Sequence, residues 1–81
     1  MNNWKEEHNY LKRTFEFHNF QAALGFVNLV GVIAEDMKHH PNITIFDYKF
    51  VRISTTTHDA GHTITEKDQE LASRINGIFE S

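Results

Sequence analysis

The sequence predicts an α+β fold, a four-stranded antiparallel sheet with its helices packed on one face, in the order β-β-α-β-β-α. Two kinds of pattern predict it. Apolar and polar residues alternate in some stretches, as in half-buried strands, and in two others apolar residues recur every three to four positions, as in helices. The chain has 81 residues, so we expect a single domain over 1–81 with one thin core.

The first hairpin is expected to end in a strand from Leu11 to Phe17, where apolar and polar residues alternate along the chain. The segment from Trp4 to Tyr10 precedes this strand and is expected to pair with it. Neither glycine nor proline marks the turn between the two segments.

A long helix is expected from Phe20 to Lys38, because Asn19 is a good N-cap and apolar residues recur at helical spacing after it. Pro41 disfavours helical geometry at His40 and ends the helix there or earlier. The helix is apolar almost all round, with a narrow polar stripe of Gln21, Asn28 and Glu35. Such a helix must be covered on two sides. We therefore expect a homodimer or homotetramer that assembles through this 20–38 helix.

The second hairpin is expected from Ile43 to Thr57, a stretch rich in β-branched and aromatic residues, with a turn over residues 46–49. Its second strand delivers His58 at its end. A closing helix follows, since Thr65 and Asp68 have the spacing of a capping box. The expected buried face of this helix consists of Leu71, Ala72, Ile75, Ile78 and Phe79.

Composition excludes several classes of function. The chain has no cysteine, which rules out disulfides and thiolate metal ligands. Its formal charge is −3 and its basic residues form no stripe, so we expect no direct binding to nucleic acid. No apolar run approaches the length of a membrane span and no signal segment is apparent, so we expect a cytoplasmic protein without membrane contact. A glycine-rich phosphate loop and a serine or cysteine nucleophile elbow are also missing.

Four of the six histidines, His39, His40, His58 and His62, lie close together along the chain. Imidazole has an unperturbed pKa of about 6.5, so it can give or take a proton near neutral pH. Glu35 lies one helical turn before His39, where its carboxylate can orient a ring. We therefore expect general acid-base chemistry on a small molecule, such as dehydration or isomerisation.

Two other interpretations compete with this one. An isolated histidine is usually a surface or junction residue with one backbone hydrogen bond, but the clustering weakens that interpretation here. A zinc site would use neutral imidazoles together with Asp59 or Glu35. Because the rings of adjacent histidines point apart, the spacing argues against zinc, and we expect no metal.

These residues belong to a longer pattern, which reads Glu35-x-x-x-His39-His40-Pro41, then six residues to Tyr48, nine to His58 and nine more to Asp68. The pattern resembles the signature of the pterin-4a-carbinolamine dehydratases, also known as dimerisation cofactors of a homeodomain transcription factor. The resemblance covers nearly the whole chain. It implies dehydration of 4a-hydroxytetrahydrobiopterin, or of a related pterin, to quinonoid dihydropterin in tetrahydrobiopterin recycling. It implies no cofactor and no metal.

The resemblance also implies roles for individual residues. His39, His40 and His58 would be the catalytic and pterin-contacting residues. Glu35 would orient a histidine, and Asp68 would lie at the pocket edge, although its spacing equally suits a helix cap. Which histidine is the acid and which the base stays open.

Further pocket contacts are implied at the end of the second hairpin, where the backbone of Thr56, Thr57 and Asp59 would present amide groups to the pterin. Lys38 stands where many relatives carry an acidic or amide residue, and His62 where glycine is common. Both change the charge of the pocket. The chain resembles a short member of the family that lacks the usual N-terminal helix. The alternative function is a non-catalytic regulatory or dimerisation module that binds a partner protein.

Overall fold

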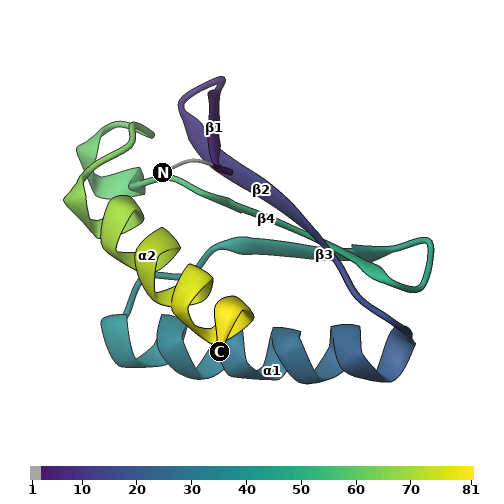
Figure 1. Ribbon diagram of the computed structural model, residues 1–81. Coiled ribbons are helices and arrows are strands. Elements are labelled where there is room, and N and C mark those ends of the chain that lie inside the picture. Colours follow the sequence, from purple (N-terminus) through teal and green to yellow (C-terminus); the bar gives the residue numbers. More distant parts are fainter. Residues whose placement is uncertain (1–2) are drawn as a thin grey trace.

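The structure is a computed structural model that describes residues 3–81 (Figure 1). Its elements along the chain are β1 (Lys5–Glu7), β2 (Tyr10–Glu16), α1 (Phe20–Met37), β3 (Asn42–Phe46), β4 (Phe50–Thr55), the short 3-10 helix η1 (His58–Ala60) and α2 (Glu66–Glu80). This is the predicted order β-β-α-β-β-α, with η1 added before the last helix.

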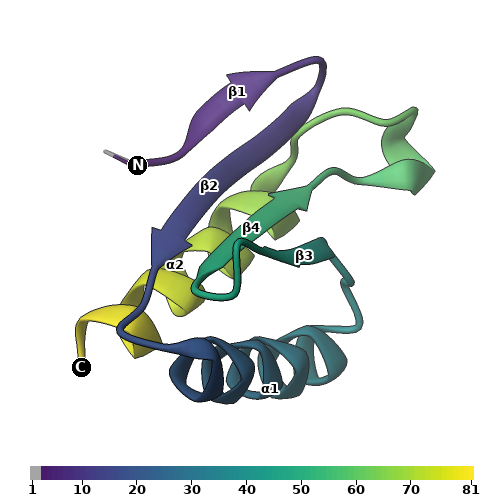
Figure 2. The ribbon, with the colours of Figure 1, turned by 90° about the vertical axis from the view of Figure 1, so that its right-hand side faces the viewer.

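The strands form one antiparallel sheet in the order β1-β2-β4-β3, which confirms the predicted α+β class. Both helices lie against one face of this sheet (Figure 1, Figure 2). Phe15 of β2 lies opposite Val51 of β4, and Val51 lies opposite Ile45 of β3. Alternation along the two central strands turns Leu11, Phe15, Val51 and Ile53 toward the helices, and all four are buried.

The turn between β1 and β2 consists of His8 and Asn9, whose φ angles are 53° and 68°. Two consecutive positive φ values are typical of the type I′ turn, which matches the twist of the two strands. Histidine and asparagine tolerate this backbone region better than most residues. The predicted hairpin is therefore present although its turn contains no glycine.

Both helices begin at the capped positions that the sequence predicts. The side chain of Asn19 accepts a hydrogen bond from the amide of Ala22 at 2.8 Å, which caps α1. Thr65 and Asp68 form a capping box at the start of α2, with each side chain accepting a backbone N–H. The caps fix where the two helices start, and so where the preceding loops end.

Helix α1 and strand β4 both end earlier in the chain than the sequence predicts. α1 ends at Met37 because Lys38 adopts a left-handed conformation with φ of 53°, and its amide donates to carbonyls of the last helical turn. β4 ends at Thr55, two residues before the predicted Thr57, because Thr57 pairs with Thr63 instead of continuing the ladder. The segments that follow these two ends, residues 38–40 and 56–59, lie at the same corner of the molecule.

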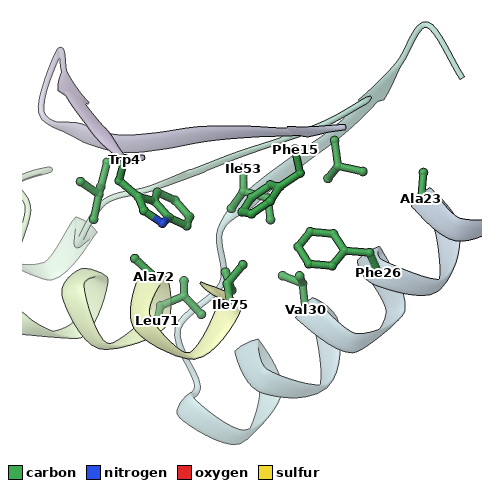
Figure 3. Close-up of a cluster of buried hydrophobic side chains, with 11 residues drawn as sticks. Trp4, Phe15, Ala23, Phe26, Val30, Ile53, Leu71, Ala72 and Ile75 are labelled. Carbon is green, nitrogen blue, oxygen red and sulfur yellow. The ribbon is translucent and has the colours of Figure 1, made fainter. Parts of the chain in front are cut away.

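The hydrophobic core lies between the sheet and the two helices (Figure 3). The rings of Phe15 and Phe26 have centroids 4.8 Å apart, and the ring of Phe79 lies 4.9 Å from that of Phe15. Trp4 is 6% exposed and donates its indole N–H to the side chain of Asn76 at 2.8 Å. Because this core fixes α1 and α2 against the sheet, it also fixes the residues at the helix ends.

α1 buries one side and exposes apolar residues elsewhere. Ala23, Phe26, Val30 and Ala34 face the core. The exposed large apolar side chains of the helix are Phe20, Leu24, Leu29 and Val32. By length and composition alone α1 is apolar enough to cross a membrane, contrary to the sequence expectation, but core helices of globular proteins meet the same criterion.

Candidate functional site

A pocket of about 320 Å³ lies where the end of α1 meets the end of β4, η1 and the start of α2. A larger hollow of about 420 Å³ lies beside the β1–β2 turn, but His8 is the only imidazole among its described lining residues. The chemistry therefore favours the smaller pocket, which we call the histidine pocket. Its lining residues are Lys38, His39, His40, Thr56, Thr57, His58, Asp59 and Lys67.

Seven of the nine predicted site residues line the histidine pocket. The other two, Glu35 and Asp68, each form a hydrogen bond with one of the pocket histidines. The fold thus brings together residues from two distant stretches of sequence, 35–40 and 56–68, at one corner of the molecule.

Asp68 lies beneath the pocket and is fully buried. Its carboxylate accepts hydrogen bonds from Nε2 of His39 at 2.6 Å, from the hydroxyls of Thr55 and Thr57 at 2.6 and 2.7 Å, and from the amide of Thr65 at 3.0 Å. Burial raises the pKa of Asp68, but these hydrogen bonds outweigh it, and the pKa lies below its ordinary value. Asp68 is therefore an ionised carboxylate with four donors.

This carboxylate decides which nitrogen of His39 carries a hydrogen. An ionised carboxylate can only accept hydrogen bonds, so Nε2 of His39 must be the donor. In the neutral ring the remaining nitrogen, Nδ1, is then an acceptor. His39 is about nine-tenths buried yet lines the pocket, so a bound molecule meets a ring whose tautomer is fixed from below.

His40 forms a second histidine–carboxylate pair, with Glu35 of the last turn of α1. Here Nε2 of His40 contacts a carboxylate oxygen of Glu35. The sequence placed Glu35 one helical turn before His39, and the ring that it contacts is the next one along the chain. The two side chains are 60% and 78% exposed, so water competes for both partners. Two neighbouring imidazoles thus each have one nitrogen directed at a carboxylate.

His58 opens η1, and Nδ1 of its ring lies 2.7 Å from Nε2 of His62. The two rings are nearly perpendicular, at 86°, with centroids 4.4 Å apart. Since Nδ1 is engaged, Nε2 is the nitrogen of His58 left for a molecule in the pocket. Both side chains are exposed, so the pair is open to solvent.

The threonines before His58 have a structural part that sequence reasoning did not foresee. The hydroxyl of Thr57 donates to Asp68, and the backbone amide of Thr57 donates to the carbonyl of Thr63 at 2.9 Å. The loop itself thus uses this amide, and a pterin contact at Thr57 stays a prediction. The hydroxyl of Thr56 donates to the carbonyl of Asn9 at 2.7 Å, which ties the loop to the β1–β2 turn.

Sequence reasoning also missed Lys67, which lines the pocket from the first turn of α2. Sequence reasoning did single out its neighbour Asp68. The position of Lys67 beside Asp68 was the one signal that could have indicated it. The ammonium groups of Lys67 and Lys38 give this corner positive charge, against one pocket carboxylate at Asp59. The described part of the chain, 3–81, holds no cluster of three or more His, Cys, Asp or Glu side chains suited to a metal ion.

The arrangement is suited to proton transfer. Each of the three pocket histidines has one ring nitrogen bound to another side chain and a second nitrogen left for a ligand. Imidazoles held in this way can act as acid and base on one small molecule near neutral pH.

Comparison with known families gives a match over residues 1–78 to the family described as pterin 4 alpha carbinolamine dehydratase. A relative from Sulfurisphaera tokodaii is 45% identical over 98% of this chain and 83% of its own length. Another, from Chloroflexus aurantiacus, is 49% identical over 94% of this chain and 80% of its own length. Both are provisionally named pterin-4-alpha-carbinolamine dehydratases.

Two solved structures are similar in fold. A transcriptional coactivator/pterin dehydratase from Brucella melitensis has a TM-score of 0.88 and 29% identity, and the match covers 96% of this chain and 83% of that protein. A pterin dehydratase-like protein, described as a RuBisCO assembly factor in the alpha-carboxysome, has a TM-score of 0.76 and 23% identity over 93% of this chain and 87% of its own. The second comparison concerns the fold alone.

Proposed function

Because this chain belongs to the pterin-4-alpha-carbinolamine dehydratase family, we propose that it removes water from 4a-hydroxytetrahydrobiopterin or a related pterin. The product is quinonoid dihydropterin, as in tetrahydrobiopterin recycling. The observation that carries the proposal is the histidine pocket, which three imidazoles from two distant stretches of the chain line together.

The reaction needs only the movement of protons and one bond cleavage. The bond between C4a and its hydroxyl oxygen breaks, and the oxygen leaves as water after an acid has given it a proton. A base takes the proton of N5. The electron pair of the broken N5–H bond then forms the second bond between N5 and C4a. Two positioned imidazoles can supply an acid and a base near neutral pH.

The hydrogen bonds of the pocket support a division of these roles. His39 donates from Nε2 to the Asp68 carboxylate, so its Nδ1 is an acceptor and the carboxylate stabilises the ring once it is protonated. We assign His39 as the base for N5. His58 keeps Nε2 free and is assigned as the acid for the departing hydroxyl. His40, oriented by Glu35, contacts the pterin.

The test is the rate of carbinolamine dehydration by purified protein, followed by absorbance. We expect wild type to exceed the buffer rate and His40→Ala to be slower. Wild type no faster than buffer would remove the enzyme function.

His39→Ala and His58→Ala are each expected to lower turnover by about 100-fold or more while the fold stays intact, as for residues in general acid-base catalysis. Circular dichroism checks the fold. The matched control is His18→Ala, which removes an exposed imidazole outside the pocket and is expected to turn over like wild type. Wild-type turnover in both pocket variants would contradict the assigned roles.

The exposed apolar residues of α1 support a homodimer or homotetramer that assembles through this helix. Val32 is 67% exposed, so Val32→Glu is expected to shift the protein to a smaller species in light scattering. Ser73→Glu, on the exposed side of α2, is the control and leaves the mass unchanged.

The same apolar residues favour the second candidate, a module that binds a partner protein. A mass equal to one chain, together with dehydration at the buffer rate, would favour this candidate over the enzyme.

A further inference from the structure

His62 contacts His58 but has no part in the reaction proposed above. Their facing nitrogens, Nδ1 of His58 and Nε2 of His62, are 2.7 Å apart, which is hydrogen-bond distance. Two imidazoles can approach so closely only if one hydrogen lies between the facing nitrogens. The pair is therefore a single hydrogen-bonded unit with one outer nitrogen on each ring.

The loop after β4 holds this contact in place. The carbonyl of Thr57 accepts hydrogen bonds from the amides of Ala60, His62 and Thr63, at 3.3, 3.1 and 3.4 Å. Gly61 and His62 follow with φ angles of 80° and 58°, in the left-handed region. A non-glycine residue stays there only where its surroundings fix it. The loop thus turns back and sets the second imidazole against the first.

The geometry limits how many protons the pair can carry. When the pair carries one proton more than two neutral rings, three hydrogens are shared among four nitrogens. One lies between the facing nitrogens, and each outer nitrogen carries one of the others. A second excess proton would set two N–H groups and two positive charges against each other at 2.7 Å. The geometry therefore lets the two rings hold one excess proton between them.

We propose that His58 and His62 act as one proton-sharing unit, in which His62 passes protons between solvent and His58. The proposal rests on the dehydration above, in which the acid loses a proton in every turnover and must regain one. When His58 gives its Nε2 hydrogen to the departing hydroxyl, it takes up the Nε2 hydrogen of His62 at its own Nδ1. His62 takes a proton from water at Nδ1, and the base returns the N5 proton to water. Once the product has left, the hops run in reverse: His58 takes a proton from water at Nε2, returns its Nδ1 hydrogen to Nε2 of His62, and His62 releases its Nδ1 proton to water. His62 is a positioning residue, since it acts through His58.

Other charged groups face the pair and enter its pH dependence. Lys38 and Lys67 line the pocket from the ends of the two helices and oppose protonation of the imidazoles. Asp59, in η1, favours it. His39 and His40 line the same pocket. A readout specific to His62 must therefore compare variants at this one position.

Two variants separate proton exchange from simple orientation. His62→Gln keeps a hydrogen-bonding group near the position of Nε2 but cannot pass a proton, and His62→Asn is too short to reach His58 but suits a positive φ. We expect both to lower kcat by about 10-fold with KM unchanged, and added imidazole to restore the rate. The control His8→Asn removes another exposed histidine with positive φ, one that does not line the histidine pocket, and turns over like wild type.

Wild-type kcat in His62→Gln would overturn the proposal, because orientation alone would then suffice. A lowered kcat that imidazole does not restore would also overturn it.

The pair can be tested without any substrate, which separates it from the proposed function. In wild type, NMR titration of the imidazole nitrogens is expected to show His58 and His62 protonating in two coupled steps, and His62→Asn to leave one simple step at His58. Two independent, identical titrations in wild type would overturn the proton-sharing unit. Coupled titration without carbinolamine turnover would instead count against the dehydratase.

Discussion

Two histidine–carboxylate pairs meet at the same pocket in contrasting surroundings. Asp68 is fully buried and His39 is 9% exposed, whereas the side chains of Glu35 and His40 are 78% and 60% exposed. Asp68 accepts three further hydrogen bonds from protein groups. Glu35 and His40 lie five residues apart at the end of α1.

The difference shows how burial changes what one chemical pairing does. A buried carboxylate has lost its water, so its hydrogen bonds are essential to the folded state and hold His39 in one tautomer. An exposed pair exchanges its contact with water at little free-energy cost and adds little to stability. The buried pair therefore stabilises both fold and site, and the exposed pair affects the site alone.

The largest expected effect comes from breaking the buried pair. Asp68→Asn keeps the shape of the side chain but sets an NH₂ group against a donor, so we expect the free energy of unfolding to fall by about 3 kcal/mol. Urea denaturation measures it. Glu35→Gln is the matched control at the exposed pair and is expected to leave the midpoint unchanged. Equal losses in the two variants would contradict the comparison.

Acid should reveal the same difference. The folded pKa of Asp68 lies below its ordinary value of 3.8, so between the two values the unfolded chain takes up a proton that the folded chain does not. Stability from this group is present above about pH 4 and is lost as the pH falls through the folded pKa, with a slope of up to about 1.4 kcal/mol per pH unit. We expect Asp68→Asn to flatten this part of the curve, and Glu35→Gln to keep it. An unchanged slope in Asp68→Asn would refute this assignment.

The smallest expected effect is on the exposed pair. Glu35→Gln weakens the orientation of His40, so we expect dehydration to slow by about 3-fold at low salt. Because salt screens exposed charges, the gap between wild type and variant should narrow at about 1 M NaCl. The measurement is turnover at both salt concentrations. A 100-fold loss would mean that the exposed pair matters as much as His39.

Much of the fold follows from local rules that the sequence carries. The caps at Asn19 and Thr65 appear where side-chain type and spacing predict them. Alternation from Leu11 to Phe17 matches β2, although both ends of the strand lie slightly earlier in the chain than predicted. Helix α1 ends at Met37, one residue before the predicted end, because Lys38 takes a left-handed conformation. A lysine at that position does not predict this conformation.

The candidate site was less accessible to sequence reasoning where contacts cross between elements. Asp68 had the spacing of a helix cap, and it is one, but its contact with His39 joins residues 29 positions apart. Lys67 escaped notice because nothing local distinguishes it from a solvated lysine. His62 was seen as a change of charge, yet its contact with His58 depends on the loop turning back at Gly61.

By itself, the sequence determined the order of strands and helices, the helix caps and the set of histidines, because alternation, helical spacing and capping act between near neighbours in the chain. The tertiary structure alone decided that Asp68 is buried under His39, that Lys67 joins the pocket, and that His58 and His62 share a hydrogen bond. These contacts arise only when the core fixes both helices against the sheet, since burial and the removal of water are properties of the packed molecule.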